Sequence, residues 1–186
     1  PGTTRAAFAA ALSAGTVEEV LVRRPVRPGD LVPVRPGTVH AIGAGILLAE
    51  VQQPSDTTYR VYDWQRLGLD GQPRPLHLSE ALQSIDFDAP PPVPQRSGEV
   101  DLGPLQLRLL HLGAGRSVDL AGDGPAVLVA VGGAAELTSP QHAPEALARG
   151  DVLLVPHACR AGARLAGAGG EAQLLLTTFP RRAAAL

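Results

Sequence analysis

The chain has 186 residues, of which 45% are hydrophobic and 3% aromatic, and its formal net charge is −2. This length allows one large domain or two small ones, with a core built from Val, Leu, Ala and Ile rather than from aromatic residues. Every basic residue is an arginine and no long basic cluster occurs, which disfavours a nucleic-acid partner and excludes lysine Schiff-base chemistry within this chain.

The cysteine count and the length of the apolar runs indicate in which cellular compartment the protein is expected. Cys159 is the only cysteine, so no intramolecular disulfide can form, and no apolar run approaches the roughly 18 residues of a membrane span. We therefore expect a cytoplasmic protein without a membrane partner; the oligomeric state does not follow from the sequence. The chain contains no methionine, from which we expect that coding sequence upstream of Pro1 is missing.

The first predicted elements are helical. Between Thr3 and Arg24, Thr4 fits an N-cap, Gly15 fits the position after a helix, and "TVEE" (16–19) resembles a capping box. From "RRPVRPGDLVPV" to about Asp63, proline and glycine punctuate a pattern of apolar residues that predicts strands. A short helix is predicted over Leu78–Ile85.

A proline-rich stretch then divides the chain. In "DAPPPVPQRSGE" the prolines exclude helix and inner strand, so the sequence predicts an extended linker over 91–97 between domains at 1–90 and 98–186. The second domain contains short alternating segments separated by Gly- and Pro-containing turns, which are typical of an antiparallel sandwich or barrel. These segments are "LQLRLLHL", "RSVDL", "AVLVAV", "AAELT", "DVLLVP", "ARLAG" and "AQLLLTTF".

A short internal echo links the two domains. "PGDLVPVRPGTVH" resembles "RGDVLLVPHACRA", and eleven residues after the glycine the first copy has His40 where the second has Ala161. If the copies are equivalent, only the first has a ligand at that position.

Several polar residues interrupt the predicted strands of the first domain. In Ile46–Gln53, alternation puts Glu50 and Gln52 on one face, directed either to water or into a polar cavity. His40 is either a histidine satisfied by a carbonyl or a metal ligand, and Arg60 is either a surface arginine that braces a turn with Asp63 or an active-site cation. Composition and spacing leave these alternatives open.

The motifs "VPVRPGTVHAIGAGILLAEVQQPSDTTYRVYDW" (32–64) and "RPLHLSEALQSIDF" (74–87) resemble the type I mannose-6-phosphate isomerases in their short bacterial form, and the resemblance covers most of residues 15–90. Residues 100–180 are similar to the second, non-catalytic barrel of that family. The resemblance implies an all-β fold with minor helical content, made of cupin (jelly-roll) barrels of which the first is incomplete. It also implies isomerisation of a small-molecule sugar phosphate, mannose 6-phosphate to fructose 6-phosphate, through a cis-enediol at a zinc site.

Carried over by residue, the resemblance implies His40 as a metal ligand, Arg60 as the active-site arginine and Glu50 as a proton-transfer acid. Gln52, Tyr59 and Asp63 match the motif in supporting, substrate-binding positions. The family's remaining metal ligands, a Gln-x-His pair and a glutamate, have no counterpart in this sequence. We therefore expect the chain to be the C-terminal part of such an isomerase and, alone, close to inactive.

Two other interpretations remain open. The second barrel could be a non-catalytic module that binds a sugar or a protein partner, which agrees with the alanine at position 161. Alternatively, the strand edges of a half-barrel could drive oligomerisation.

Overall fold

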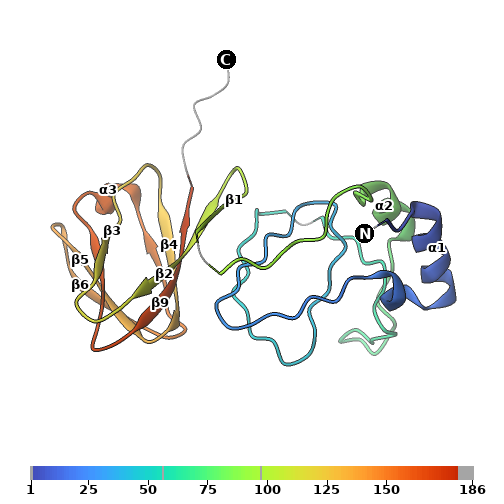
Figure 1. Ribbon diagram of the computed structural model, residues 1–186, viewed down its shortest axis with the longest axis horizontal. Helices are drawn as coiled ribbons and strands as arrows, with labels where there is room; N and C mark the ends of the chain where they lie inside the picture. Colours follow the sequence, from blue (N-terminus) through green and yellow to red (C-terminus); the bar gives the residue numbers. More distant parts are fainter. Residues whose placement is uncertain (1, 56, 97, 180–186) are drawn as a thin grey trace, which may run out of the picture. The chain divides into compact units, whose positions relative to one another are not determined.

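The computed structural model describes residues 2–55, 57–96 and 98–179, and the chain divides into two compact units (Figure 1). The N-terminal unit comprises Pro1–Arg27 and Val32–Val93, and the C-terminal unit comprises Pro28–Leu31 and Pro94–Leu186. Ser97, within the predicted linker, lies outside the described residues. Residues just before it are paired rather than free, because Leu31 and Gln95 exchange two backbone hydrogen bonds of 2.8 Å.

Helices of the N-terminal unit follow their sequence signals closely. Helix α1 (Arg5–Ala14) begins after Thr4, whose hydroxyl accepts a hydrogen bond from the Ala7 N–H at 3.2 Å, and it ends at Gly15 with φ 74°. Both predicted caps are thus confirmed. Helix α2 (Leu78–Ser84) confirms the second predicted helix.

The predicted capping box at Thr16 is wrong. Residues Val17–Val20 form a single 3₁₀ turn, η1, and the Thr16 side chain makes no capping hydrogen bond. The backbone of Thr16 (φ −107°, ψ 25°) is not extended, so its hydroxyl is not presented to the following N–H groups as a capping residue requires.

The strands predicted between residue 25 and Asp63 are not formed in the part of the chain that the structure describes. In that stretch the only bridge is the one from Leu31 to Gln95, and just beyond it Leu67 bridges Pro73. A strand needs a neighbour to pair its N–H and C=O groups, and alternation alone does not provide one. The residues that the pattern placed on one strand face, from Ile46 to Gln52, are mostly exposed.

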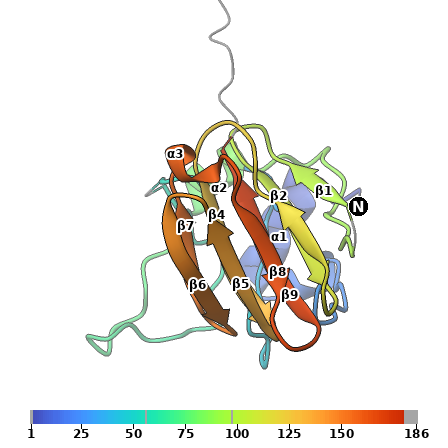
Figure 2. The ribbon, with the colours of Figure 1, turned by 90° about the vertical axis from the view of Figure 1, so that its left-hand side faces the viewer.

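The C-terminal unit is an antiparallel sandwich of two sheets (Figures 1 and 2). The five-stranded sheet has the order β1 (Glu99–Asp101), β2 (Gln106–Leu112), β9 (Ala172–Thr178), β4 (Ala126–Gly132), β7 (Val152–Val155). The four-stranded sheet has the order β3 (Ser117–Asp119), β8 (Arg164–Gly167), β5 (Ala134–Ser139), β6 (His142–Ala148). A short helix, α3 (His157–Arg160), follows β7. The antiparallel sandwich predicted for this half is confirmed.

The core lies between the two sheets. Leu128, Leu165 and Leu174 are fully buried there, and they come from β4, β8 and β9. Side chains two residues apart along a strand share a face, so Leu110 and Leu112 of β2 enter the same core. Strand β6 was not predicted, because only Leu147 of its seven residues is buried and its sequence does not alternate.

The two echo copies share a turn and then diverge. Gly29 (φ 88°) and Gly150 (φ 100°) both adopt the positive φ that glycine permits without strain. After Gly150 the chain forms β7 and α3, whereas after Gly29 it reaches His40 without forming a strand.

Candidate active-site region

His40 follows a turn at Gly37 (φ 84°), where the Thr38 N–H donates to the carbonyl of Arg35. Its ring is exposed, and Nδ1 lies 3.0 Å from the carbonyl oxygen of Thr38. A carbonyl can only accept, so Nδ1 is the donor in this contact and Nε2 is the ring nitrogen left for a ligand. The carbonyl-satisfied histidine and the metal-ligand histidine are therefore compatible descriptions of this residue.

A small cavity of about 50 Å³ adjoins His40. Its lining is mostly apolar and consists of Val17, Leu21, Val39, His40, Ala41, Val61, Tyr62 and Trp64. Neither Glu50 nor Arg60 is among these residues, so this cavity is not one that the three predicted site residues share.

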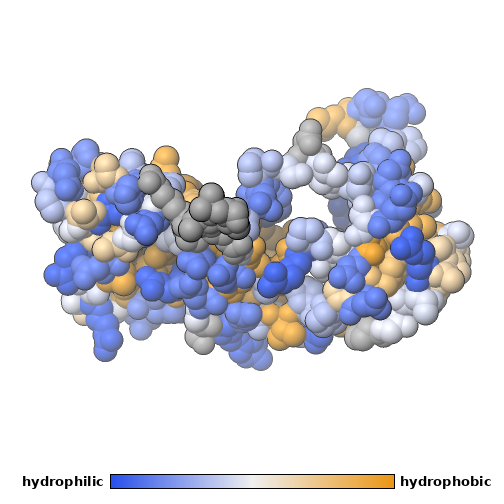
Figure 3. All heavy atoms as spheres, turned by 90° about the horizontal axis from the view of Figure 1, so that it is seen from above, coloured by the Kyte–Doolittle hydropathy of each residue, from blue (hydrophilic) through white to orange (hydrophobic). Residues whose placement is uncertain are grey.

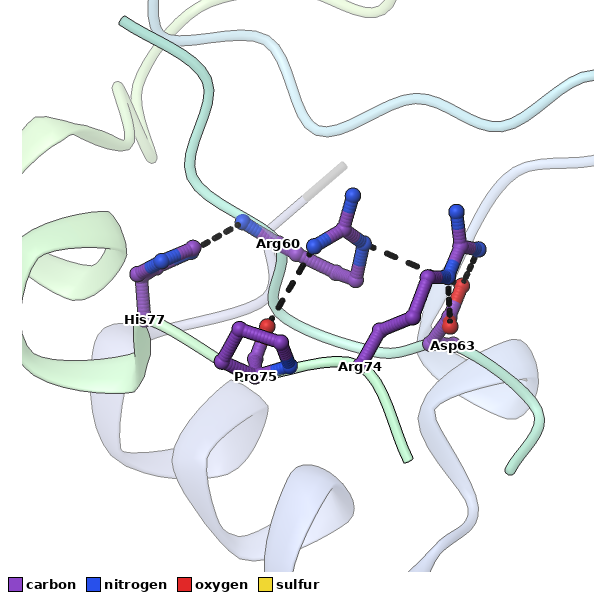
Figure 4. Close-up of polar contacts among 5 residues, drawn as sticks. All are labelled: Arg60, Asp63, Arg74, Pro75 and His77. Carbon is purple, nitrogen blue, oxygen red and sulfur yellow. Dashed lines mark hydrogen bonds and ion pairs between the residues drawn. The ribbon is translucent and has the colours of Figure 1, made fainter. Parts of the chain in front are cut away.

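Arg60 belongs to a cluster of charged and polar groups shown in Figure 4. Its backbone N–H donates to Nδ1 of His77 at 3.2 Å, and the His77 N–H donates to the carbonyl of Arg60 at 2.8 Å. Its guanidinium donates to the carbonyl of Pro75 at 3.3 Å, and its Nε lies 3.9 Å from a carboxylate oxygen of Asp63. Both the backbone and the side chain of Arg60 are therefore held by residues 63–77.

Asp63 is the buried member of this cluster, with 9% of its surface exposed. Arg74 donates to both carboxylate oxygens, through Nε at 2.6 Å and through Nη2, which is a bidentate pair. This hydrogen bonding lowers the pKa of Asp63 and raises that of Arg74. Burial by itself would raise the pKa of Asp63, but the positive charges of Arg74, Arg60 and Arg66 lower it further. Asp63 thus remains a carboxylate, and Arg60 contacts it only at longer range.

The backbone next to Asp63 is strained. Trp64 (φ 49°) and Gln65 (φ 56°) both adopt the left-handed conformation, which costs about 1–2 kcal/mol per residue without glycine. Trp64 is held in place by its Nε1, which donates to the carboxylate of Glu18, and by its ring, which meets that of Tyr62 edge-to-face at 5.1 Å. Strained residues that the surrounding structure holds in place are found most often near functional sites.

The other predicted site residues lie toward solvent. Glu50, Gln52 and Tyr59 are exposed, and the Tyr59 ring is 6.1 Å from that of His77. Sequence reasoning missed Arg74 and His77, although both fall within the "RPLHL" segment that carries part of the family resemblance. In residues 2–55, 57–96 and 98–179, no three His, Cys, Asp or Glu side chains are grouped so that they could hold a metal ion.

The N-terminal unit carries large hydrophobic side chains on its surface (Figure 3). Leu47 is 88% exposed, and Ile42, Ile46 and Leu48 are each between 44% and 55% exposed. Nearly all the large hydrophobic residues that the structure describes as exposed belong to this unit; in the C-terminal unit they are Val152 and Leu154.

Comparison with known proteins agrees with the motif analysis. Over 94 residues the chain is 45% identical to the mannose-6-phosphate isomerase ManA of Bacillus subtilis (strain 168), and over 79 residues it is 43% identical to that of Streptococcus mutans. The chain resembles mannose-6-phosphate isomerases. The predicted resemblance is confirmed over half of the chain in the first case and 42% in the second. No protein-family model matches the chain.

The solved mannose 6-phosphate isomerase of Bacillus subtilis shares the fold. It matches 95% of this chain with a TM-score of 0.74 at 24% identity, and the match covers 58% of that structure. The sequence matches span only 29% and 25% of the two curated mannose-6-phosphate isomerases. No helix among the described residues combines the length and apolar character needed to cross a membrane.

Proposed function

We propose that the protein acts as a mannose-6-phosphate isomerase, with part of the active site supplied from outside the described residues. The observation that carries the proposal is the 45% identity to a curated isomerase over 94 residues, which is half of this chain. The substrate is then a small sugar phosphate and, because the lone Cys159 gives no sign of an oxidising environment, we propose the cytoplasm as the compartment.

The described residues do not by themselves fit a catalytic metal site. A catalytic zinc needs about three protein ligands, and His40 is the one candidate that the resemblance assigns. We therefore propose zinc only for an active site to which further polypeptide adds metal ligands. The roles proposed below for residues of this chain do not require a metal.

Arg60 is proposed to contact the oxygens that become negative in the enediol, or the phosphate of the substrate. A guanidinium is permanently charged and presents a planar set of donors, so it suits either task. The Asp63–Arg74 pair supports this role, because Arg74 occupies the carboxylate and leaves Arg60 only partly committed to it. The His77 ring accepts a hydrogen bond from the Arg60 backbone N–H, and the Pro75 carbonyl accepts one from its guanidinium, so both help to fix the position of Arg60.

Glu50 is proposed to move the proton between the two carbons, which is the work of a general base and then a general acid. Gln52 and Tyr59, both exposed and polar, are proposed to contact substrate hydroxyls. Asp63 acts by positioning the arginines rather than by contacting substrate.

The test is a coupled assay of mannose 6-phosphate turnover on two proteins. One is the 186-residue chain alone, and the other is a chimera in which the chain replaces the matching segment of the Bacillus subtilis relative. We expect negligible turnover by the chain alone and clear turnover with bound metal by the chimera. Arg60→Gln in the chimera should remove most of the activity, whereas Arg23→Gln, at an exposed site, should not. A folded, metal-loaded chimera without turnover would refute the proposal.

A further inference from the structure

The C-terminal unit contains a cavity of about 280 Å³ that is separate from the residues of the proposed isomerase site. It is open to solvent. It is formed by β1, β2 and β9, by the loop between β3 and β4, and by α3. The polar and charged residues that line it include Glu99, Gln106, Arg108, Asp119, Asp123 and Arg160.

Arg160 is a buried cation in the wall of this cavity, with 4% of its surface exposed. Its Nε donates to the carbonyl of Leu120 at 2.7 Å, and its Nη1 donates to the carbonyls of Asp123 and Gly124 at 3.1 and 2.9 Å. No carboxylate within ion-pair distance neutralises it among the described residues. The third nitrogen, Nη2, has no hydrogen-bond partner among the described residues. Its two N–H groups therefore remain for a ligand.

Arg108 supplies a second unused donor. Its Nε is buried and has no hydrogen-bond partner within residues 2–55, 57–96 and 98–179. Arg108 lies two residues before Leu110, a core residue, so its side chain leaves β2 on the face that lines the interior of the sandwich. A buried donor without an acceptor costs about 1–3 kcal/mol, so a ligand that accepts this hydrogen bond is favoured.

The acidic residues of the lining decide the class of ligand. Glu99 lies opposite Arg108 in the β1–β2 register, Asp119 is paired with Arg164 at 3.4 Å, and all three carboxylates, including Asp123, are on exposed residues. Carboxylates repel a bare anion but accept hydrogen bonds from hydroxyl groups. The cavity therefore matches a molecule that carries both an anionic group and several hydroxyls. The two guanidinium groups suit the anion, and the exposed carboxylates and the amide of Gln106 suit the hydroxyls.

We propose that this cavity binds a small phosphorylated polyol. Arg108 and Arg160 contact the phosphate, and Glu99, Asp119 and Gln106 contact the hydroxyl groups. A volume of about 280 Å³ is close to the lower limit of known ligand pockets, which suits a molecule of monosaccharide size. The site involves no bond making or breaking, and it does not depend on the isomerase activity, because none of its residues belongs to the cluster around Arg60.

Isothermal titration calorimetry on the full chain tests the proposal, with glucose 6-phosphate, glucose and inorganic phosphate as probes. We expect saturable binding of glucose 6-phosphate at millimolar or lower concentration, no binding of glucose, and at least about tenfold weaker binding of phosphate. Arg108→Gln should weaken glucose 6-phosphate binding by about tenfold or more, equivalent to about 1.4 kcal/mol. The matched control is Arg149→Gln, an exposed arginine at the β6–β7 turn, which should bind as the unaltered chain does.

Amide chemical-shift mapping on the unaltered chain locates the site without relying on a variant that might not fold. We expect glucose 6-phosphate to shift the amide signals of Gly122, Asp123 and Gly124. Shifts confined to residues around Arg60 would overturn the proposal, because they would place the ligand at the isomerase site. Equal binding by Arg108→Gln would also overturn it. Phosphate that binds as tightly as glucose 6-phosphate would overturn the role assigned to the carboxylates.

Discussion

Replacement of Arg160 by methionine tests whether one buried cation holds the β3–β4 loop. The guanidinium donates to three backbone carbonyls, those of Leu120, Asp123 and Gly124, and Gly122 leaves room for it, because a Cβ there would lie 2.7 Å from Nη2. Each hydrogen bond from a charged donor contributes about 1.5–3 kcal/mol. Burial lowers the pKa of Arg160, so loss of the charge also relieves a desolvation cost and offsets part of that sum. We expect a net loss of about 3 kcal/mol.

The distribution of aromatic residues makes this effect measurable for one unit at a time. Trp64, Tyr59 and Tyr62, which are all the Trp and Tyr residues of the chain, lie in the N-terminal unit, so fluorescence follows that unit. Far-UV circular dichroism follows the sheets of the other unit together with helices α1 and α2, and the fluorescence transition identifies the part that comes from the N-terminal unit. Arg160→Met should lower the thermal midpoint seen by circular dichroism by about 10 °C or more and leave the fluorescence transition unchanged. Arg149→Met is the exposed control. A change within about 0.5 kcal/mol of the unaltered chain would refute the reasoning.

Two further predictions concern stability. Because Arg74 lowers the pKa of Asp63 in the folded state, the Asp63 carboxylate stabilises the N-terminal unit above its unfolded-state pKa of about 3.9, and this contribution is lost as the pH falls through the lower folded-state pKa. Asp63→Asn should therefore flatten the acid limb of a fluorescence-detected stability profile; an unaltered limb would contradict this. In urea unfolding, Gly133→Ala should destabilise the C-terminal unit by more than about 2 kcal/mol, because the added Cβ would lie 2.0 Å from the Glu171 carbonyl oxygen and φ is 66°. Gly150→Ala should cost only about 1 kcal/mol in the same experiment, because φ is also positive there but the space around the added Cβ is open. Equal costs at the two glycines would show that the close contact is not what matters.

Local signals account for what the sequence predicted correctly. The cap of α1 depends on Thr4 and Gly15, which act within a few residues of themselves. The strand around Leu128 alternates between buried and half-buried residues because one of its faces packs against the opposite sheet. Strand β6 lacks that alternation, since it lies at the edge of its sheet and buries little, so the sequence did not predict it.

The strands predicted for the N-terminal unit depended on information that a local pattern does not carry. Alternation around Glu50 describes a segment suited to a sheet, but the pairing that makes a strand is a property of its neighbours. The same distinction applies to the site. The pattern identified Arg60 and Asp63, but it paired them with each other, whereas the structure pairs Asp63 mainly with Arg74, which lies eleven residues away in the sequence.

The position of Arg60 is nevertheless well defined in a segment that forms no regular strand. Its backbone exchanges two hydrogen bonds with His77, just before α2, and its side chain is held between Pro75 and Asp63. Such contacts replace the sheet pairing that the segment lacks, so this arginine keeps a fixed geometry. The His40 side chain, by contrast, is hydrogen-bonded within its own turn, and Glu50 is exposed. An active site that uses all three residues therefore needs further polypeptide to position His40 and Glu50, but it finds Arg60 already in place.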